Sequence, residues 1–234
     1  MKRIIRILVY VLLITFFSYT IYRNLKLHVI PSVDLIKDEA TATLYQRLIP
    51  STSNLVWKNF YYSHDSITMK DIPEAMRYNI AYKNTTTSSS NIAEEDFKKG
   101  YEKVFGPNTY KKVDSFMGGC NSYTYNAAEK TYNSTKRTVC QNSDISVLSR
   151  IVDASATKHK MDITVVIVYI DESKKEVYKH CNEDMSKCSD VVKKNIVDFD
   201  ERDIDITDKT LNKYKFTYKK IDDEYYFDSI KRIK

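Results

Sequence analysis

The sequence predicts an α+β fold, in which an N-terminal transmembrane helix precedes two or three helices packed on a curved antiparallel β-sheet. Three observations predict it: an uncharged apolar run at residues 7–22, helical spacing between residues 34 and 105, and alternating patterns after Pro107. Helices that precede the strands along the chain are typical of this class. The 234 residues include only 4 glycines, which argues against the glycine-rich phosphate-binding folds.

The first element is the apolar run ILVYVLLITFFSYTIY at residues 7–22. It extends back to Ile4 if the Arg6 side chain reaches up to the lipid headgroups. A helix of that length would measure about 28 Å, close to the roughly 30 Å of a hydrocarbon core. We therefore expect residues 1–26 to form a cytoplasmic flank and a single transmembrane signal anchor.

The flanking charges predict the orientation of this anchor. Lys2, Arg3 and Arg6 precede the run together with the amino terminus, and positive charge favours the cytoplasmic side. The N-terminus is therefore expected in the cytoplasm, and the C-terminal domain is expected outside the cytoplasm at the cell membrane. A cleaved signal peptide stays open as an alternative, with Ser18 and Thr20 as the nearest small residues.

The net charge of +6 is concentrated at this flank. Residues 1–26 hold five of the 37 basic side chains and no acid, which leaves 32 basic against 31 acidic side chains in the rest of the chain. The excess therefore predicts a membrane flank rather than a basic face, and nucleic acid is not expected as a partner. The expected partners are the membrane, through the N-terminal helix, and an envelope protein or peptide.

Helical spacing recurs in three stretches after the anchor: residues 34–49, 72–83 and 91–105. Capping boxes are expected at the second and third, from Asp71 with Glu74 and from Asn91 with Glu94.

Residues 55–62 (LVWKNFYY) favour an extended or loop segment with Trp57 as a core anchor. We assign residues 27–64 to a membrane-proximal helix and connector, and residues 65–234 to an extracytoplasmic α+β domain.

The pattern changes to strands after Pro107. The strand MDITVVIVYI at residues 161–170 is apolar on both alternating faces, so we place it centrally in the sheet. The helices are expected to cover one face of this sheet and to leave the other partly open. The expected strands are residues 113–117, 123–125, 145–156, 161–170, 214–219 and 225–233, of which 145–156 with 161–170 and 214–219 with 225–233 form hairpins.

Four cysteines follow the anchor, at Cys120, Cys140, Cys181 and Cys188. An extracytoplasmic domain permits disulfides, and of the three possible connectivities we prefer Cys120–Cys140 with Cys181–Cys188. Free thiols and a metal site that includes His180 are the alternatives. The cysteine spacings of 20, 41 and 7 lack the close pair of a zinc site, so no metal ligand is assigned.

The stretches EEDFKKGYEKVFG (residues 94–106), GGC (118–120) and YKFTYKKIDDEYYFDSIKRI (214–233) resemble a family of small membrane-anchored secreted proteins of low-GC Gram-positive bacteria. The resemblance covers residues 65–234 and implies a cystatin-like or nuclear-transport-factor-like domain, with a curved antiparallel sheet that cups helices. The shared motifs are structural, so no functional residue is carried over.

No catalytic or cofactor-binding residue is assigned. The chain lacks the phosphate-binding loop, the dinucleotide fingerprint, the zinc-protease helix motif and the Cys-x-x-Cys motif. His64-Asp65-Ser66 is interpreted as a polar loop, because catalytic triads assemble in space rather than in sequence. The acidic run at residues 198–208 is interpreted as a solvated strand or loop, with calcium binding as the alternative.

The resulting hypothesis is a single-pass, membrane-anchored extracytoplasmic protein that serves as a non-enzymatic binding or structural module at the cell envelope. The alternative is a small-ligand-binding protein or hydrolytic enzyme that uses the cavity of a cone-shaped α+β fold. The chain contains 19 tyrosines, which cross-strand packing explains better than a ligand surface does.

Overall fold

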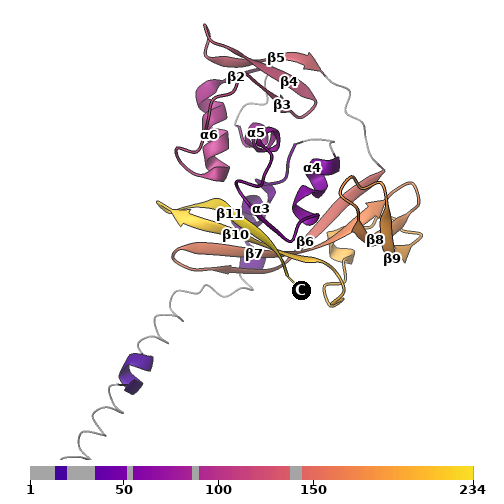
Figure 1. Ribbon diagram of the computed structural model, residues 1–234. Coiled ribbons are helices and arrows are strands. Elements are labelled where there is room, and N and C mark those ends of the chain that lie inside the picture. Colours follow the sequence, from indigo (N-terminus) through magenta and orange to yellow (C-terminus); the bar gives the residue numbers. More distant parts are fainter. Residues whose placement is uncertain (1–13, 20–34, 52–54, 86–89, 138–143, 234) are drawn as a thin grey trace, which may run out of the picture.

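The computed structural model describes residues 14–19, 35–51, 55–85, 90–137 and 144–233. They form an α+β fold in which a layer of helices lies between two antiparallel sheets (Figure 1). The predicted class is confirmed. The expectation of one sheet with helices on a single face is wrong, because the residues after Pro107 divide between two sheets.

The larger sheet has seven strands and is strongly curled. Its order is β1-β11-β10-β7-β8-β9, and β6 also pairs with β7. The strands are β1 (Ser66–Thr68), β6 (Ile145–Ala156), β7 (Lys160–Asp171), β8 (Glu176–Cys181), β9 (Cys188–Lys194), β10 (Lys213–Ile221) and β11 (Glu224–Ile233).

Strand β7 is the centre of this sheet, as its sequence predicts. It pairs with β6 over almost its whole length. Its other edge is shared, because β10 pairs up to Val166 and β8 pairs from Tyr169 onward. The predicted hairpins β6–β7 and β10–β11 are both confirmed.

The smaller sheet has the order β2-β5-β4-β3. Two of its strands are the ones expected around Gly118 and Gly119, whereas β2 and β5 were not predicted. Strand β5 has the mainly polar sequence TYNSTKR, which is typical of a loop when the sequence is considered alone. The strands are β2 (Asn91–Ala93), β3 (Ser115–Gly118), β4 (Asn121–Asn126) and β5 (Thr131–Arg137).

Four helices occupy the middle layer (Figure 1): α3 (Glu39–Gln46), α4 (Leu55–Asn59), α5 (Glu74–Lys83) and α6 (Glu94–Phe105). The three expected helices are present but shorter than predicted. The extended segment expected at residues 55–62 is wrong, because α4 continues there into a 3₁₀ turn that buries three aromatic rings, Phe60, Tyr61 and Tyr62.

Both expected capping boxes are wrong. Asp71 closes its own turn by accepting hydrogen bonds from the amide and hydroxyl of Thr68, each at 2.7 Å. Asn91 lies in β2, and Glu94 accepts a hydrogen bond from the Tyr125 hydroxyl at 2.6 Å. A local turn engages Asp71 and a tertiary partner engages Glu94, so neither carboxylate is available for a capping box.

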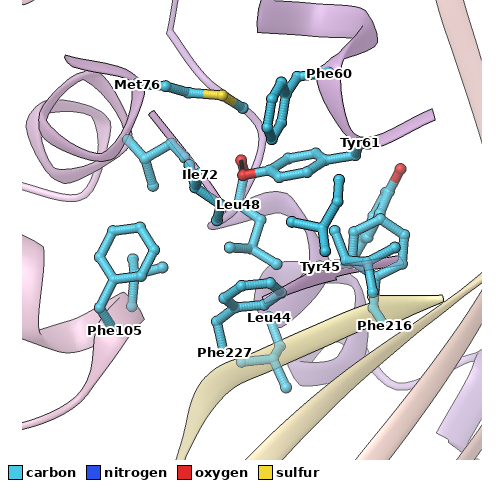
Figure 2. Packing of buried hydrophobic residues seen from close by; sticks show 14 of the residues in the cluster. Leu44, Tyr45, Leu48, Phe60, Tyr61, Ile72, Met76, Phe105, Phe216 and Phe227 are labelled. Atoms are coloured by element: carbon cyan, nitrogen blue, oxygen red, sulfur yellow. Dashed lines mark hydrogen bonds between the residues drawn. The ribbon is translucent and has the colours of Figure 1, made fainter. Parts of the chain in front are cut away.

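One hydrophobic core joins the helices to the sheets. Figure 2 shows Leu44 of α3 and Leu48, which follows that helix, in one cluster with Phe216 and Phe227 of the larger sheet. The same cluster includes Tyr61, so residues 35–62 and the later segments share this core.

Helices α5 and α6 approach most closely at Gly100. A Cβ at this position would lie 2.7 Å from the carbonyl oxygen of Ala81 on α5, which is closer than real contacts allow. Glycine therefore permits this helix contact.

The described part of the predicted anchor, residues 14–19, is helical and exposed. Most of the predicted span lies outside the described residues. Within the described ranges, the structure has no helix that is both long and apolar enough to cross a bilayer.

Replacing Gly100 by Ala is expected to destabilise the protein by about 1–2 kcal/mol. Alanine normally favours a helix over glycine by roughly 0.5–1 kcal/mol, but crowding a closely packed contact costs about 1–3 kcal/mol. Urea unfolding measures the sign of the change. The exposed neighbour Lys99→Ala is the control and should have a small effect, and a more stable G100A variant would contradict this account of the helix contact.

Replacing Asp171 by Asn is expected to lower stability at neutral pH. Burial acts to raise the pKa of Asp171, but hydrogen bonds from the Ser173 hydroxyl and from Lys174 outweigh it and lower the pKa below its usual 3.8. The folded state therefore gains stability above the unfolded pKa and loses it as the pH falls through the folded pKa. Unfolding curves from neutral pH into acid should converge for the two proteins, and curves that stay parallel would refute this role.

Candidate functional site

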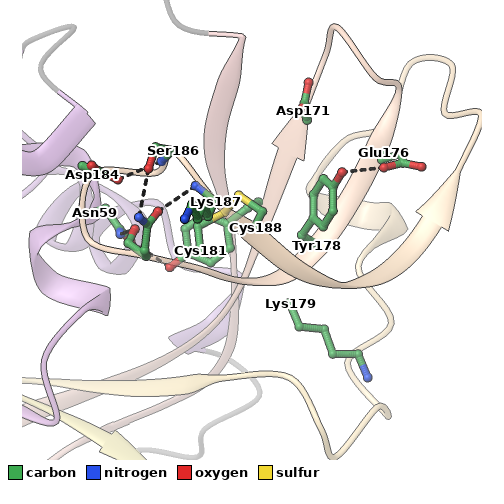
Figure 3. The surroundings of a disulfide bond; sticks show 12 residues. Asn59, Asp171, Glu176, Tyr178, Lys179, Cys181, Asp184, Ser186, Lys187 and Cys188 are labelled. Atoms are coloured by element: carbon green, nitrogen blue, oxygen red, sulfur yellow. Dashed lines mark hydrogen bonds between the residues drawn. A yellow bond between two sulfur atoms is a disulfide. The ribbon is translucent and has the colours of Figure 1, made fainter.

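Two of the four predicted disulfide cysteines face each other at the tip of the β8–β9 hairpin. Cys181 and Cys188 are direct partners in the antiparallel register, with Cα atoms 4.0 Å apart, and they form a disulfide (Figure 3). This pair confirms the prediction. Cys120 is also disulfide-bonded, while Cys140, its predicted partner, lies outside the described residues. No cysteine in the described ranges is a free thiol.

The loop that this disulfide closes is fixed to the body of the domain by Asn59 of α4. The Asn59 side-chain amide donates to the carbonyls of Asn182 and Glu183 at 2.9 and 3.2 Å, and its oxygen accepts from the Tyr169 hydroxyl at 2.7 Å. Met185, at the loop's tip, is 1% exposed and belongs to the main core. The loop is therefore a rigid part of the surface.

His180, next to Cys181, belongs to a line of polar side chains. The Asn212 amide nitrogen lies 2.8 Å from His180 Nδ1, and His180 Nε2 lies 3.6 Å from an Asp190 carboxylate oxygen. Because the amide donates, Nδ1 accepts, and a neutral His180 carries its proton on Nε2 towards Asp190. Asn212 in turn accepts from Arg232 at 2.5 Å, and Arg232 lies 3.7 Å from Asp65.

This line joins an imidazole, an amide, a guanidinium and two carboxylates. It crosses the larger sheet near one end of β8, β10 and β11, and among the described residues no hydroxyl or thiol is hydrogen-bonded to the imidazole. The metal alternative at His180 is not supported, since no three His, Cys, Asp or Glu side chains in the described ranges come together as metal ligands.

The His64-Asp65-Ser66 triplet forms no triad. His64 Nδ1 lies 2.9 Å from the Phe60 carbonyl oxygen, Asp65 faces Arg232, and Ser66 begins β1 opposite Lys231. Each residue therefore has a separate structural role.

The acidic run at residues 198–208 folds into successive turns. Of the predicted strand or loop, the structure has the loop, in which several of the carboxylates cap turns. Asp200 accepts from the Arg202 amide at 2.7 Å, and Asp205 accepts from the Thr207 amide at 2.9 Å. Asp208 binds the hydroxyl and amide of Thr210, which lowers the pKa of its carboxyl to about 2. These carboxylates point into separate turns instead of converging on one cation.

The buried tyrosines form a network of hydroxyl hydrogen bonds. The Tyr45 hydroxyl lies 2.6 Å from the Tyr62 hydroxyl and 2.9 Å from Ser149 Oγ. The Tyr214 hydroxyl donates to the Tyr62 carbonyl at 2.6 Å. Burial raises the pKa of Tyr45 and of Tyr62, so both phenols keep their protons at neutral pH and act as donors.

Three hollows open on the described surface. One, of about 260 Å³, lies between α3 and β6 and is lined by Tyr45, Gln46 and Ser149. A second, of about 290 Å³, is lined by Leu35 and Met161. A third, of about 330 Å³, lies beside α5. Ligand cavities usually measure about 300–1,000 Å³, so the first two hollows fall just below this range and the third lies at its lower end.

Sequence reasoning missed Asn59 and Asn212, the two amides that join separate elements. The only signal for Asn59 is a polar residue inside the aromatic run at residues 55–62. Asn212 has no local signal, because its partners lie 20 or more residues away, in β8 or at the end of β11.

Replacing Asn59 by Ala is expected to destabilise the protein by about 1–3 kcal/mol, because the buried Tyr169 hydroxyl and two part-buried carbonyls lose their partner. Backbone hydrogen exchange at residues 182–187 should also accelerate while the disulfide stays intact. Lys58→Ala on the same helix is the control and should change neither quantity. Unchanged exchange in N59A would show that Asn59 does not hold the loop.

Comparison of the chain with models of protein families, with curated proteins and with solved structures finds no significant match. The resemblance to cystatin-like domains therefore stays a prediction from the residues quoted above.

Proposed function

We propose that this chain is a single-pass membrane protein with a cytoplasmic N-terminus, and that its folded domain is a non-enzymatic binding or structural module outside the cytoplasm. The observation that carries the proposal is the Cys181–Cys188 disulfide. Disulfides persist in oxidising compartments and are rare in the cytosol. The uncharged run at residues 7–22 supplies the anchor.

A binding or structural role is favoured because the reactive side chains are engaged in the fold. The buried phenols donate hydrogen bonds to neighbours, and the acidic run caps its own turns. His180 is placed between an amide and a carboxylate. These groups therefore stabilise the domain.

A protein or peptide partner would find its most suitable surface on the β8–β9 hairpin. The disulfide and Asn59 hold this hairpin rigid, which lowers the entropic cost of binding. Strand β9 ends the larger sheet and exposes Val191 and Val192 at 42% and 40%. Apolar side chains on a rigid edge strand suit a partner that adds an extended segment.

The second candidate function is binding of a small ligand in the hollow between α3 and β6. The observation that favours it is the Tyr45–Ser149 hydroxyl pair on the wall of that hollow. The Tyr45 hydroxyl donates its one proton to Ser149 Oγ, so the Ser149 hydroxyl is the group that can donate to an acceptor atom of a ligand.

Labelling of intact cells with a membrane-impermeant maleimide tests the proposed topology. The wild-type chain should be labelled only after treatment with an impermeant reductant. The Cys181→Ser variant should be labelled without reductant, because Cys188 is then a free thiol on the outside. A Lys2→Cys substitution in a background without the other cysteines should be labelled only after permeabilisation.

Two results would overturn the proposal. Labelling of the C181S variant only in permeabilised cells would place the domain in the cytoplasm. Full labelling of the wild-type chain without reductant would show that its cysteines are not paired.

A further inference from the structure

The outer face of the larger sheet carries a group of lysines that no feature of the core requires. Along β10, Tyr214 and Phe216 point into the helical core, so Lys213 and Lys215 point to the opposite face. Lys231 of β11 lies directly opposite Lys215 in the register. We call Lys213, Lys215 and Lys231 the lysine face.

The charge of the lysine face is only partly offset within the described part of the domain. None of its three lysines takes part in the ion pairs of that part. Asp162 of β7 interacts electrostatically with Lys215, but its carboxylate is bound directly to Lys160 at 2.8 Å and to Thr217 at 2.8 Å. Like charges directly opposite each other in a sheet are destabilising, so Lys215 and Lys231 favour an anionic ligand.

The neighbours of these lysines suit phosphate oxygens. Thr164 lies beside Lys215 on β7, and Ser66 lies beside Lys231 on β1. Farther along β7 the same face of the sheet is closed by a second apolar cluster that includes Val168 and Leu211. The second cluster therefore limits the lysine face at one end. The exposed remainder presents the lysine ammonium groups together with the hydroxyls of Thr164 and Ser66.

The lysine face also lies within reach of the proposed anchor. Leu35, the first described residue of the domain, shares a hollow with Met161 and Tyr225, so the chain enters beside the β6–β7 and β10–β11 turns. Twelve residues, 23–34, separate the apolar run from Leu35. Twelve residues span at most about 43 Å, so the domain stays close to the bilayer.

We propose that the lysine face docks on the anionic phospholipid headgroups of the bilayer that holds the anchor. This inference rests on the proposed membrane anchoring. The near-neutral sum of charge after residue 26 does not oppose it, because six of the 31 acids lie in the turns of residues 198–208 while these lysines share one face. Each lysine near an anionic surface strengthens the association about fivefold.

The test is lysine footprinting of the full chain in nanodiscs, which leave both sides of the bilayer accessible. Discs of phosphatidylcholine alone are compared with discs that contain phosphatidylglycerol, and an uncharged acetylating reagent reports each lysine by mass spectrometry. Lys215 and Lys231 should react about fivefold more slowly in the anionic discs, and high salt should remove the difference. Lys98, Lys99 and Lys103 on α6 are the internal control and should not change.

Matched variants make the test specific. In K215E/K231E, the protection of the remaining Lys213 should be lost, whereas K98E/K99E should keep it. Equal reaction rates in the two kinds of disc would overturn the proposal. Protection by soluble DNA or polyphosphate in phosphatidylcholine discs, with none from phosphatidylglycerol, would overturn it in favour of a soluble polyanion.

Failure of the chain to enter phosphatidylcholine discs would overturn the anchoring itself, and the docking with it. Incorporation without protection would overturn the docking alone. The two proposals therefore fail in distinguishable ways.

Discussion

The burial of β7 on both faces is the constraint on which the rest of the structure depends. One face enters the main core below the helices, and the other enters a second cluster closed by the chain between β9 and β10. A strand that is buried on both faces lies in the interior of a sheet, with partners along both of its hydrogen-bonding edges. Strand β6 pairs along one edge of β7, while β10 and β8 each pair with part of the other edge. This division sends the β8–β9 hairpin away from the body of the sheet, where the disulfide and Asn59 are needed to fix its tip.

The helical layer is joined to this sheet largely through tyrosines. A phenol fills the volume of an aromatic core side chain, but its hydroxyl must find a partner when it is buried. The partners here are backbone carbonyls of the helical layer, as in Tyr218 to Leu44 and Tyr214 to Tyr62, or a hydroxyl of the sheet, as in Tyr45 to Ser149. Each such bond specifies where the helical layer lies, because a shifted helix would leave a buried hydroxyl unsatisfied. The cost is that these side chains are unavailable for chemistry at a surface.

Alternation along the chain predicted the long strands and the central position of β7, because burial on two faces leaves an unbroken apolar run. It failed at residues 55–62, where bulky aromatics favour a strand but the core receives them from a helix and a 3₁₀ turn. It also missed β5, β8 and β9, whose residues are mainly polar because these strands have an open face or an open edge. The Cys181–Cys188 pair was predictable from spacing, but its support by Asn59 depends on a contact 123 residues away.

Contacts between residues far apart in the sequence also explain why the charge count predicted no basic face. A sum of charge counts lysines and acids wherever they lie, whereas the face depends on the register between β10 and β11. Phe227 and Ile230 are both buried although they are three residues apart, which an uninterrupted strand does not allow. A bulge opposite Thr217 and Tyr218 resolves the conflict by giving β11 one extra residue. Beyond that bulge, Lys231 lies on the outer face beside Lys215. The burial of both Phe227 and Ile230 therefore places these two lysines next to each other on the opposite face.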